Sequence, residues 1–222
     1  MKVGGLLLIA LLWSVSPAIA VAGSIHGVVH VPPESESGRK PNPYPGRASS
    51  LQQREIAARG SVTDAVIYIE SVPARVDSTL PHPAGTPAME QRDQAFVPRV
   101  VALAQGGSVA FPNRDPIFHN VFSVSPVKRF DLGKYPKGHS KQVRFDKPGL
   151  VQVFCDIHPS MACFILVLPN RAFARPDDSG AYALPRLPAG TYTLKLWHPD
   201  FGEVARTVKV PAGGEVTVDL GY

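Results

Sequence analysis

The sequence predicts an all-β protein, and three observations support this fold class. Proline (23 residues) and glycine (19 residues) are both more frequent in the 222-residue chain than in average proteins, which favours many turns over long helices. Short runs rich in β-branched residues recur along the chain. Turn-forming pairs such as Gly106-Gly107 and Pro112-Asn113 separate these runs at regular intervals, a pattern typical of β-sandwiches and barrels.

The first 22 residues are predicted to be a secretory signal peptide. Lys2 provides a positive start, residues 4–13 form an apolar run, and small-residue cleavage sites end near Ala20 and Ala22. A membrane anchor is the alternative, but the apolar run is shorter than the roughly 20 residues that a span requires. We therefore expect a periplasmic or secreted protein with no membrane span after cleavage.

Two segments near the N-terminus are expected to be strands. Residues 24–31 and 61–70 have the β-branched content of strands. Residues 32–60, which separate them, are rich in Pro, Ser, Gly and Arg and are predicted to be a disordered insertion. Residues 73–88 are rich in proline and are predicted to be a second linker.

Short strands follow closely between residues 88 and 169, which we expect to form a domain of their own. The expected strands cover residues 99–103, 108–111, 119–123, 142–145, 150–155 and 163–168. Alternate side chains of a strand share one face, so Val151, Val153 and Cys155 point to the same side. Cys155 is therefore expected to end a buried row at the rim of a sheet.

The C-terminal residues 170–222 are expected to form a meander of four strands. These strands cover residues 181–184, 191–198, 204–210 and 215–220. About 50 residues are too few to bury a good core. We therefore expect the N-terminal strands of residues 23–75 to pair with this meander as one discontinuous sandwich. The alternative is that they extend the sheets of residues 88–169.

The charge balance favours an acidic protein partner. The formal net charge is +5, and removal of a leader containing Lys2 leaves +4. In an exported protein this surplus makes nucleic acid an improbable partner and an acidic protein surface the natural one. Seven basic residues lie between Lys128 and Lys147, against Asp131 and Asp146. They form either a patch that steers a partner or an ordinary solvated edge.

The residue types that carry chemistry are concentrated on one predicted loop. Cys155, His158 and Met161 lie three residues apart and offer a thiolate, an imidazole and a thioether. His119, at the start of a different strand, offers a second imidazole. Two imidazoles and one thiolate with a weak axial Met are the ligands of a blue-copper site. These four residues are therefore candidate ligands of one copper ion.

Other interpretations of the same residues remain open. The two histidines are compatible with surface or capping roles, and Met161 with a role in the core. Cys155 and Cys163 are compatible with a disulfide in an oxidising compartment. A catalytic Cys–His pair would need a third member, which the sequence does not make obvious. A structural zinc site would need a fourth strong ligand, for which Cys163 is the remaining thiol.

The segment of residues 94–168 resembles the cupredoxins. The shared motifs are Phe96-Val97-Pro98, Gly107-x-Val109-x-Phe111, Asn113-x-Asp115 followed by His119-Asn120, Phe145-x3-Gly149 and Cys155-x2-His158-x2-Met161. The spacing from the cysteine to the methionine is similar to that of amicyanin and shorter than that of plastocyanin. The resemblance implies a Greek-key sandwich that holds one type 1 copper ion on His119, Cys155, His158 and Met161.

The resemblance also implies roles for neighbours of the ligands. Asn120 is expected to tie its strand to the cysteine loop by a hydrogen bond, with Asp156 as its partner. Asp156 departs from the Ser or Thr that cupredoxins often carry after the cysteine. His158 and Pro159 are expected to form the port through which an electron passes to a partner, whereas His119 is expected to be more enclosed.

The C-terminal region has a second resemblance. Residues 177–184 and 187–194 are similar to the glycine-turn and strand repeats of carboxypeptidase-regulatory-like, transthyretin-type sandwiches. This resemblance implies an Ig/transthyretin-like β-sandwich that is divided by the inserted copper domain.

Together these features predict a one-electron carrier between periplasmic redox proteins. The expected partner is a cytochrome or a dehydrogenase with an acidic surface. An enzyme is not expected, because none of the seven histidines forms the His-x-His pair that a multicopper oxidase needs. The alternative is copper delivery or storage without redox turnover, although such sites are usually rich in Met or Cys.

Overall fold

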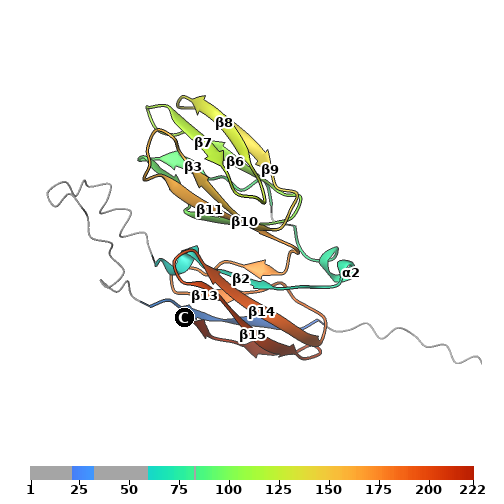
Figure 1. The fold of residues 1–222 in the computed structure, drawn as a ribbon. Helices are drawn as coiled ribbons and strands as arrows, with labels where there is room; N and C mark the ends of the chain where they lie inside the picture. Colours follow the sequence, from blue (N-terminus) through green and yellow to red (C-terminus); the bar gives the residue numbers. More distant parts are fainter. Residues whose placement is uncertain (1–21, 33–59, 83) are drawn as a thin grey trace, which may run out of the picture.

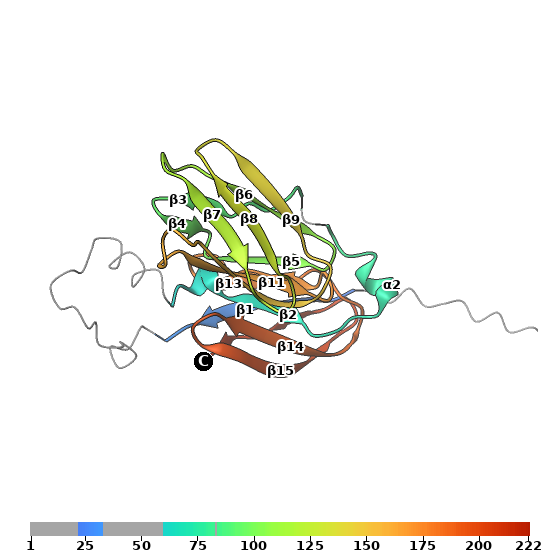
Figure 2. The same cartoon turned by 45° about the horizontal axis from the view of Figure 1, so that its top comes forward.

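The structure is a computed structural model that describes residues 22–32, 60–82 and 84–222. Almost all of its regular elements are strands, so the predicted all-β class is confirmed. Figures 1 and 2 show two packed lobes, with β3 to β11 in one and the N-terminal and C-terminal strands in the other. The predicted signal peptide and disordered insertion fall almost wholly outside the described residues.

The first sandwich contains nine strands. They are β3 (Glu90–Arg92), β4 (Ala95–Val97), β5 (Val100–Ala104), β6 (Ser108–Pro112), β7 (His119–Ser123), β8 (Phe130–Tyr135), β9 (Ser140–Arg144), β10 (Gly149–Phe154) and β11 (Ala162–Leu168). One sheet has the order β5-β11-β10-β7-β8. The facing layer consists of the pairs β6–β9 and β3–β4, which are joined by isolated bridges such as Gln91↔Asn113.

Alternating side chains build the core between these layers. In β10, Val151 and Val153 are fully buried, whereas Gln152 between them is exposed. Val153 pairs with Cys163 of β11 in the antiparallel register, so this row of the core continues into the next strand. The row ends at Cys155, which is 4% exposed and lies at the rim of the sheet.

The second sandwich combines strands from both ends of the chain. They are β1 (Ser24–His30), β2 (Val66–Ile69), β12 (Phe173–Ala174), β13 (Ala181–Ala183), β14 (Gly190–His198), β15 (Gly202–Val210), β16 (Glu215–Thr217) and β17 (Leu220–Gly221). One sheet has the order β13-β1-β16, with β17 also paired to β1, and the other has the order β12-β2-β14-β15.

The N-terminal strands occupy central positions in these two sheets. β1 pairs antiparallel with β13 and parallel with β16, and β2 pairs with β12 and β14. The C-terminal strands therefore obtain from β1 and β2 the partners that they lack among themselves. The pairing of these segments agrees with the expected discontinuous sandwich, whereas the residue limits given above for the domains and the transthyretin-type resemblance stay predictions.

Two local expectations were wrong. The expected strand of residues 61–70 begins with a 3-10 turn, η2 (Val62–Asp64), so the strand β2 starts only at Val66. The expected linker of residues 73–88 contains a short helix, α2 (Ala74–Asp77). Pro73 precedes this helix as its N-cap, where its missing N–H group costs no hydrogen bond. Within the part of the chain that the structure describes, no helix has the length and apolarity that crossing a bilayer demands.

The two sandwiches meet through an apolar layer with one ionic cluster. Six buried side chains form the layer: Val66, Tyr68, Val100, Leu166, Leu168 and Trp197. At its edge, the Arg99 guanidinium of the first sandwich donates to both carboxylate oxygens of Asp200 at 2.7 Å and to Asp64 at 3.0 Å. The buried apolar area stabilises the junction, and the bidentate pairing of Arg99 with Asp200 defines its orientation.

Candidate metal centre

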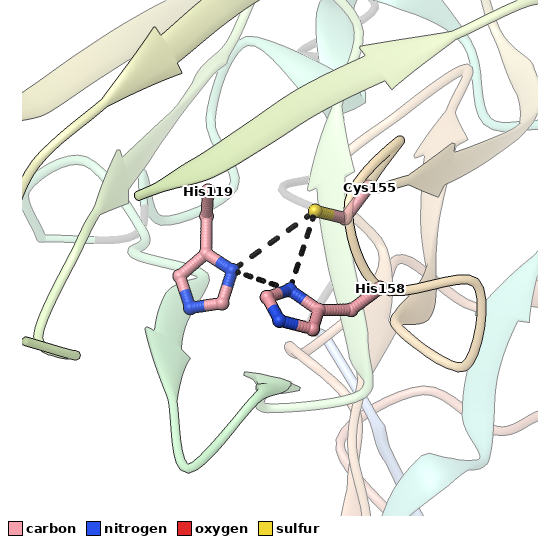
Figure 3. Close-up of side chains that lie close together, drawn as sticks. All are labelled: His119, Cys155 and His158. Atoms are coloured by element: carbon pink, nitrogen blue, oxygen red, sulfur yellow. Dashed lines mark hydrogen bonds between the residues drawn. The ribbon is translucent and has the colours of Figure 1, made fainter. Parts of the chain in front are cut away.

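Three predicted ligands meet at one end of the first sandwich. The Cys155 thiol lies 4.0 Å from Nδ1 of His119 and 4.0 Å from Nδ1 of His158, and the two Nδ1 atoms are 3.1 Å apart. Figure 3 shows both rings turned so that these nitrogens face the sulfur. The three residues form the one group of metal-binding side chains found among the described residues.

The fold positions each member of this group differently. His119 is the first residue of β7 and pairs with Tyr135 of β8, which directs its ring into the buried end of the sandwich. Cys155 directly follows β10 and continues its inward face. His158 lies on the following loop, which two backbone hydrogen bonds close, from Cys155 N to the Met161 carbonyl at 3.3 Å and from Met161 N to the His158 carbonyl at 2.9 Å.

The fourth candidate, Met161, lies at the end of the same closed loop. Its side chain is 1% exposed and belongs to the same buried cluster as Cys155. The position is consistent with an axial thioether as well as with a core residue. Its assignment as a ligand therefore stays a prediction.

A buried carboxylate that had no assigned role in the sequence analysis orients the first histidine. Oδ2 of Asp115 lies 2.7 Å from Nε2 of His119. A carboxylate in this place accepts a proton from Nε2, so Nδ1 keeps its lone pair toward Cys155 and His158. The signal in the sequence was an acid four residues before a histidine at a strand start, which is too common a pattern to single out Asp115.

Hydrogen bonds keep this carboxylate ionised. Burial raises the pKa of Asp115, but bonds from the backbone of Gln94 and Asp93 and from His119 lower it more in sum, so the pKa lies below its usual value. The pKa of His158 is lowered by burial and then by repulsion from His119. His158 is therefore neutral near pH 7, as a metal-binding imidazole must be.

The expected hydrogen bond between Asn120 and Asp156 was wrong. The Asn120 amide donates instead to Oδ1 of Asp131 at 2.7 Å, which joins β7 to β8. Asp156 is half-exposed, and its carboxylate lies 3.8 Å from Nζ of Lys134. The reason is geometric, because β8 runs beside β7 and brings Asp131 next to Asn120, whereas Asp156 turns outward from the loop.

The size of the Cys–His–His triangle fits a single metal ion. First-row metals bind imidazole at about 2.0–2.1 Å and thiolate at about 2.3 Å. From the three distances above, a point in the plane about 2.05 Å from both nitrogens lies about 2.3 Å from the sulfur. Two imidazole lone pairs this close repel each other unless a cation or a proton lies between them, so the donor set favours metal binding.

The structure also bears on the other interpretations. Cys155 and Cys163 are both free thiols, and Sγ of Cys163 lies 2.8 Å from Sδ of Met89 in the core, where burial raises its pKa. Cys163 therefore neither forms the disulfide nor supplies a fourth zinc ligand. Cys155, His119 and Asp115 do form the series of three residues that a catalytic cysteine needs. However, the Cys155 thiol is only 4% exposed and a second imidazole faces it, which favours a metal site over a catalytic pair.

Comparison with known proteins gives matches at the level of solved structures. No family model and no curated protein matches the chain. A Cu-containing nitrite reductase from Thermus scotoductus SA-01 is 23% identical over 43% of this chain and 27% of that chain, with a TM-score of 0.36. A purple cupredoxin from Nitrosopumilus maritimus is 20% identical over 34% of this chain and 83% of its own, with a TM-score of 0.32. A reduced Cu(I) amicyanin variant is 21% identical over 47% of this chain and 98% of its own, with a TM-score of 0.36.

Proposed function

We propose that this chain is an exported type 1 copper protein that acts as a one-electron carrier between periplasmic redox proteins. The observation that carries the proposal is the triangle formed by one thiol and two imidazole nitrogens, with distances of 4.0, 4.0 and 3.1 Å. His119, Cys155 and His158 would hold copper in a trigonal plane, and Met161 would be the weak axial ligand. Bound copper would supply the Cu(I)/Cu(II) couple.

The surroundings of the triangle suit a carrier because they restrict movement of the ligands. His119 is anchored by Asp115, Cys155 ends a core strand, and backbone hydrogen bonds close the loop that carries His158. Ligands held in one arrangement move little when the charge of the ion changes. Little reorganisation favours rapid one-electron transfer.

The two imidazoles differ in their access to solvent. His119 is 0% exposed, whereas His158 is partly exposed between Ile157 and Pro159, both of which are exposed. Phe118, next to the first ligand in the chain, is 55% exposed. An apolar collar at this end lets a partner approach His158 closely and expels water. We infer that electrons pass through the edge of the His158 ring.

A basic edge beside the site indicates the charge of the partner. Lys134, Lys137 and Lys141 are all exposed on or between β8 and β9. The Lys134–Asp156 contact of 3.8 Å brings this edge next to the cysteine loop. Positive charge at the rim of a docking surface increases the encounter rate with an acidic partner, such as a cytochrome or dehydrogenase, more than it increases affinity.

Copper titration of the purified protein tests the proposal. We expect one equivalent of copper to produce an intense visible absorption and the paramagnetic-resonance signal of a copper–thiolate bond, with reversible one-electron oxidation. Cys155→Ser should abolish the absorption. Cys163→Ser is the matched control, since it changes a buried cysteine of the same domain, and it should retain the absorption.

Two outcomes would contradict the proposal. Loss of the absorption in Cys163→Ser but not in Cys155→Ser would show that the wrong thiol has been assigned. Tight binding of Cu(I) by the wild-type protein without reversible oxidation would exclude a carrier and favour copper delivery or storage.

A further inference from the structure

The turn between β3 and β4 has an unfavourable backbone conformation. Arg92 pairs with Ala95, so only Asp93 and Gln94 form the turn. Their φ angles are +56° and +57°. Two-residue turns of this type favour Asn-Gly and Asp-Gly, because Asn and Asp tolerate a left-handed backbone better than other residues that carry a Cβ. Asp93 suits the first position, but Gln94 occupies the position that favours Gly, so other interactions are needed to hold the turn in place.

A single carboxylate compensates for this conformation. The backbone N–H of Asp93 donates to Oδ1 of Asp115 at 2.7 Å, and that of Gln94 donates to Oδ2 at 2.8 Å. Consecutive N–H groups that converge in this way form an anion-binding concavity. Oδ2 also lies 2.7 Å from Nε2 of His119, so the oxygen that holds the turn also contacts the first imidazole.

The position of Asp115 is itself determined from the other side. Its backbone N–H donates to Oδ1 of Asn113 at 2.9 Å, and the Asn113 amide donates to the carbonyls of Ile117 and Tyr135. Tyr135 is the cross-strand partner of His119. Asp115 is thus fixed between the β3–β4 turn and the strands that carry the metal centre.

We propose that Asp115 is a positioning residue that presets the metal-binding nitrogen of His119, and that the β3–β4 turn holds Asp115 in place. This inference rests on the proposed function, because the metal is the copper ion proposed there. By accepting the Nε2 proton, Asp115 leaves Nδ1 free in the metal-free protein. Metal binding then needs no rearrangement of the His119 ring, and the turn becomes coupled to the ligand 26 positions further along the chain.

Asp115→Asn is the informative substitution. A neutral amide oxygen accepts the Nε2 proton less strongly than a carboxylate, and an amide nitrogen at the position of Oδ2 would donate to Nε2 instead, so the proton of the His119 ring should shift toward Nδ1, which is the nitrogen needed for the metal. In either orientation the amide nitrogen would face a backbone N–H, that of Gln94 or that of Asp93. The turn should remain formed, because Gln91 donates to the Tyr135 hydroxyl at 2.7 Å and accepts from the Arg114 backbone at 2.8 Å.

Glu90→Gln is the matched control. Glu90 is an acid on the same hairpin, and it contacts the Arg114 and Arg92 guanidinium groups at 3.1 and 3.3 Å rather than a histidine. Its replacement removes the same charge from the same region. A general electrostatic effect would therefore affect both variants, whereas a positioning effect would affect only Asp115→Asn.

The first measurement is the tautomer of His119, read from ¹⁵N–¹H correlations of the metal-free protein at one fixed pH. We expect the Nε2–H form in the wild type and in Glu90→Gln, and a shift to the Nδ1–H form in Asp115→Asn. The second measurement is the affinity for Co²⁺ and copper. Asp115→Asn should lower it about 10- to 100-fold, whereas Glu90→Gln should change it less than about twofold.

The amide hydrogens of Asp93 and Gln94 provide a third measurement. Their exchange should slow on metal binding in the wild type and should not respond in Asp115→Asn. An unchanged tautomer, or equal affinities in the two variants, would overturn the inference. If Asp115→Asn fails to fold, the wild-type tautomer decides, since an Nδ1–H form excludes presetting. A wild-type protein that binds no copper would refute the proposed function but leave the tautomer result valid.

Discussion

Two fully buried histidines, one at the candidate metal centre and one at the junction of the sandwiches, have different surroundings. Both His119 and His198 are 0% exposed, and each lies close to an aspartate. Nε2 of His198 lies 3.0 Å from the Ser61 carbonyl, and its Nδ1 accepts the backbone N–H of Asp200 at 3.1 Å. At His119, Nε2 contacts the Asp115 carboxylate, whereas Nδ1 faces a thiol and another imidazole.

The difference separates a structural histidine from a candidate ligand. A buried polar group without a hydrogen bond is costly, so a folded protein normally satisfies each nitrogen of a buried ring. The junction does so at His198 with two backbone groups. The metal centre instead brings two ring nitrogens and a sulfur together with no backbone partner for them. Burial alone therefore does not indicate a ligand, whereas convergence of metal-donor atoms that lack backbone partners does.

The strongest test of this comparison is the same substitution at both histidines. His119→Gln should abolish copper binding and cost little stability, because the glutamine amide can still donate to Asp115. His198→Gln should retain copper binding and lower the free energy of unfolding by about 2–4 kcal/mol, since it leaves the Ser61 carbonyl or the Asp200 N–H without a partner. Copper titration and chemical denaturation measure the two effects.

A single result would remove the distinction. If His198→Gln prevented copper binding in a protein that remains folded, the junction would belong to the metal centre. If His119→Gln lowered stability more than His198→Gln did, His119 would have mainly a structural role.

Sequence reasoning found the convergent group but missed what holds it. His119, Cys155 and His158 could be predicted because the ligand types and the short spacing after the cysteine carry the signal. Asp115, Asp131 and the satisfied state of His198 could not be predicted in the same way. Each depends on contacts with segments that only the folded sheets bring together, such as the turn at Asp93 for Asp115 and Ser61 for His198.

The strands, like the site residues, were predicted only in part. Apolar strands such as β7 and β10 were found with nearly correct limits, because one of their faces is buried. The hairpin of β3 and β4 and the strand β8 were missed. β8 contains Asp131, Gly133 and Lys134, which are exposed at a sheet edge, and only Tyr135 is buried. Edge strands do not need the apolar alternation by which strands are recognised.

A smaller effect is expected at the two aspartates that share Arg99 in the junction. Burial raises the pKa of Asp200, but hydrogen bonds from Arg99 and from the backbone of Gly60 lower it more, so it lies below the ordinary value of 3.8. The pKa of Asp64 is raised, mainly by burial, although Arg99 opposes this. The two carboxylates should therefore respond to pH in opposite directions.

We expect Asp200→Asn to lower the free energy of unfolding at pH 7 by about 1–3 kcal/mol, and Asp64→Asn to lower it less. A depressed carboxylate stabilises the fold above its ordinary pKa, and this contribution is lost as the pH falls through the folded pKa. The difference between wild type and Asp200→Asn should thus shrink below about pH 3.8. Denaturant titrations at pH 7 and pH 3 measure it, and a difference that grows on acidification would contradict the assignment.

The smallest expected effect compares surface charge beside the metal centre with surface charge on the second sandwich. Lys137 lies in the exposed turn between β8 and β9, and Lys209 is exposed on β15. Lys137→Gln should slow oxidation of the copper(I) protein by hexacyanoferrate(III) about two- to fivefold at low ionic strength, because the anion approaches an edge that has lost positive charge. Lys209→Gln should leave the rate unchanged. Both variants should approach the wild-type rate near 1 M salt, where the screening length is only about 3 Å. With a cationic oxidant, Lys137→Gln should instead speed the oxidation. Equal effects of the two variants would mean that the anion responds to net charge and not to the basic edge beside the metal centre.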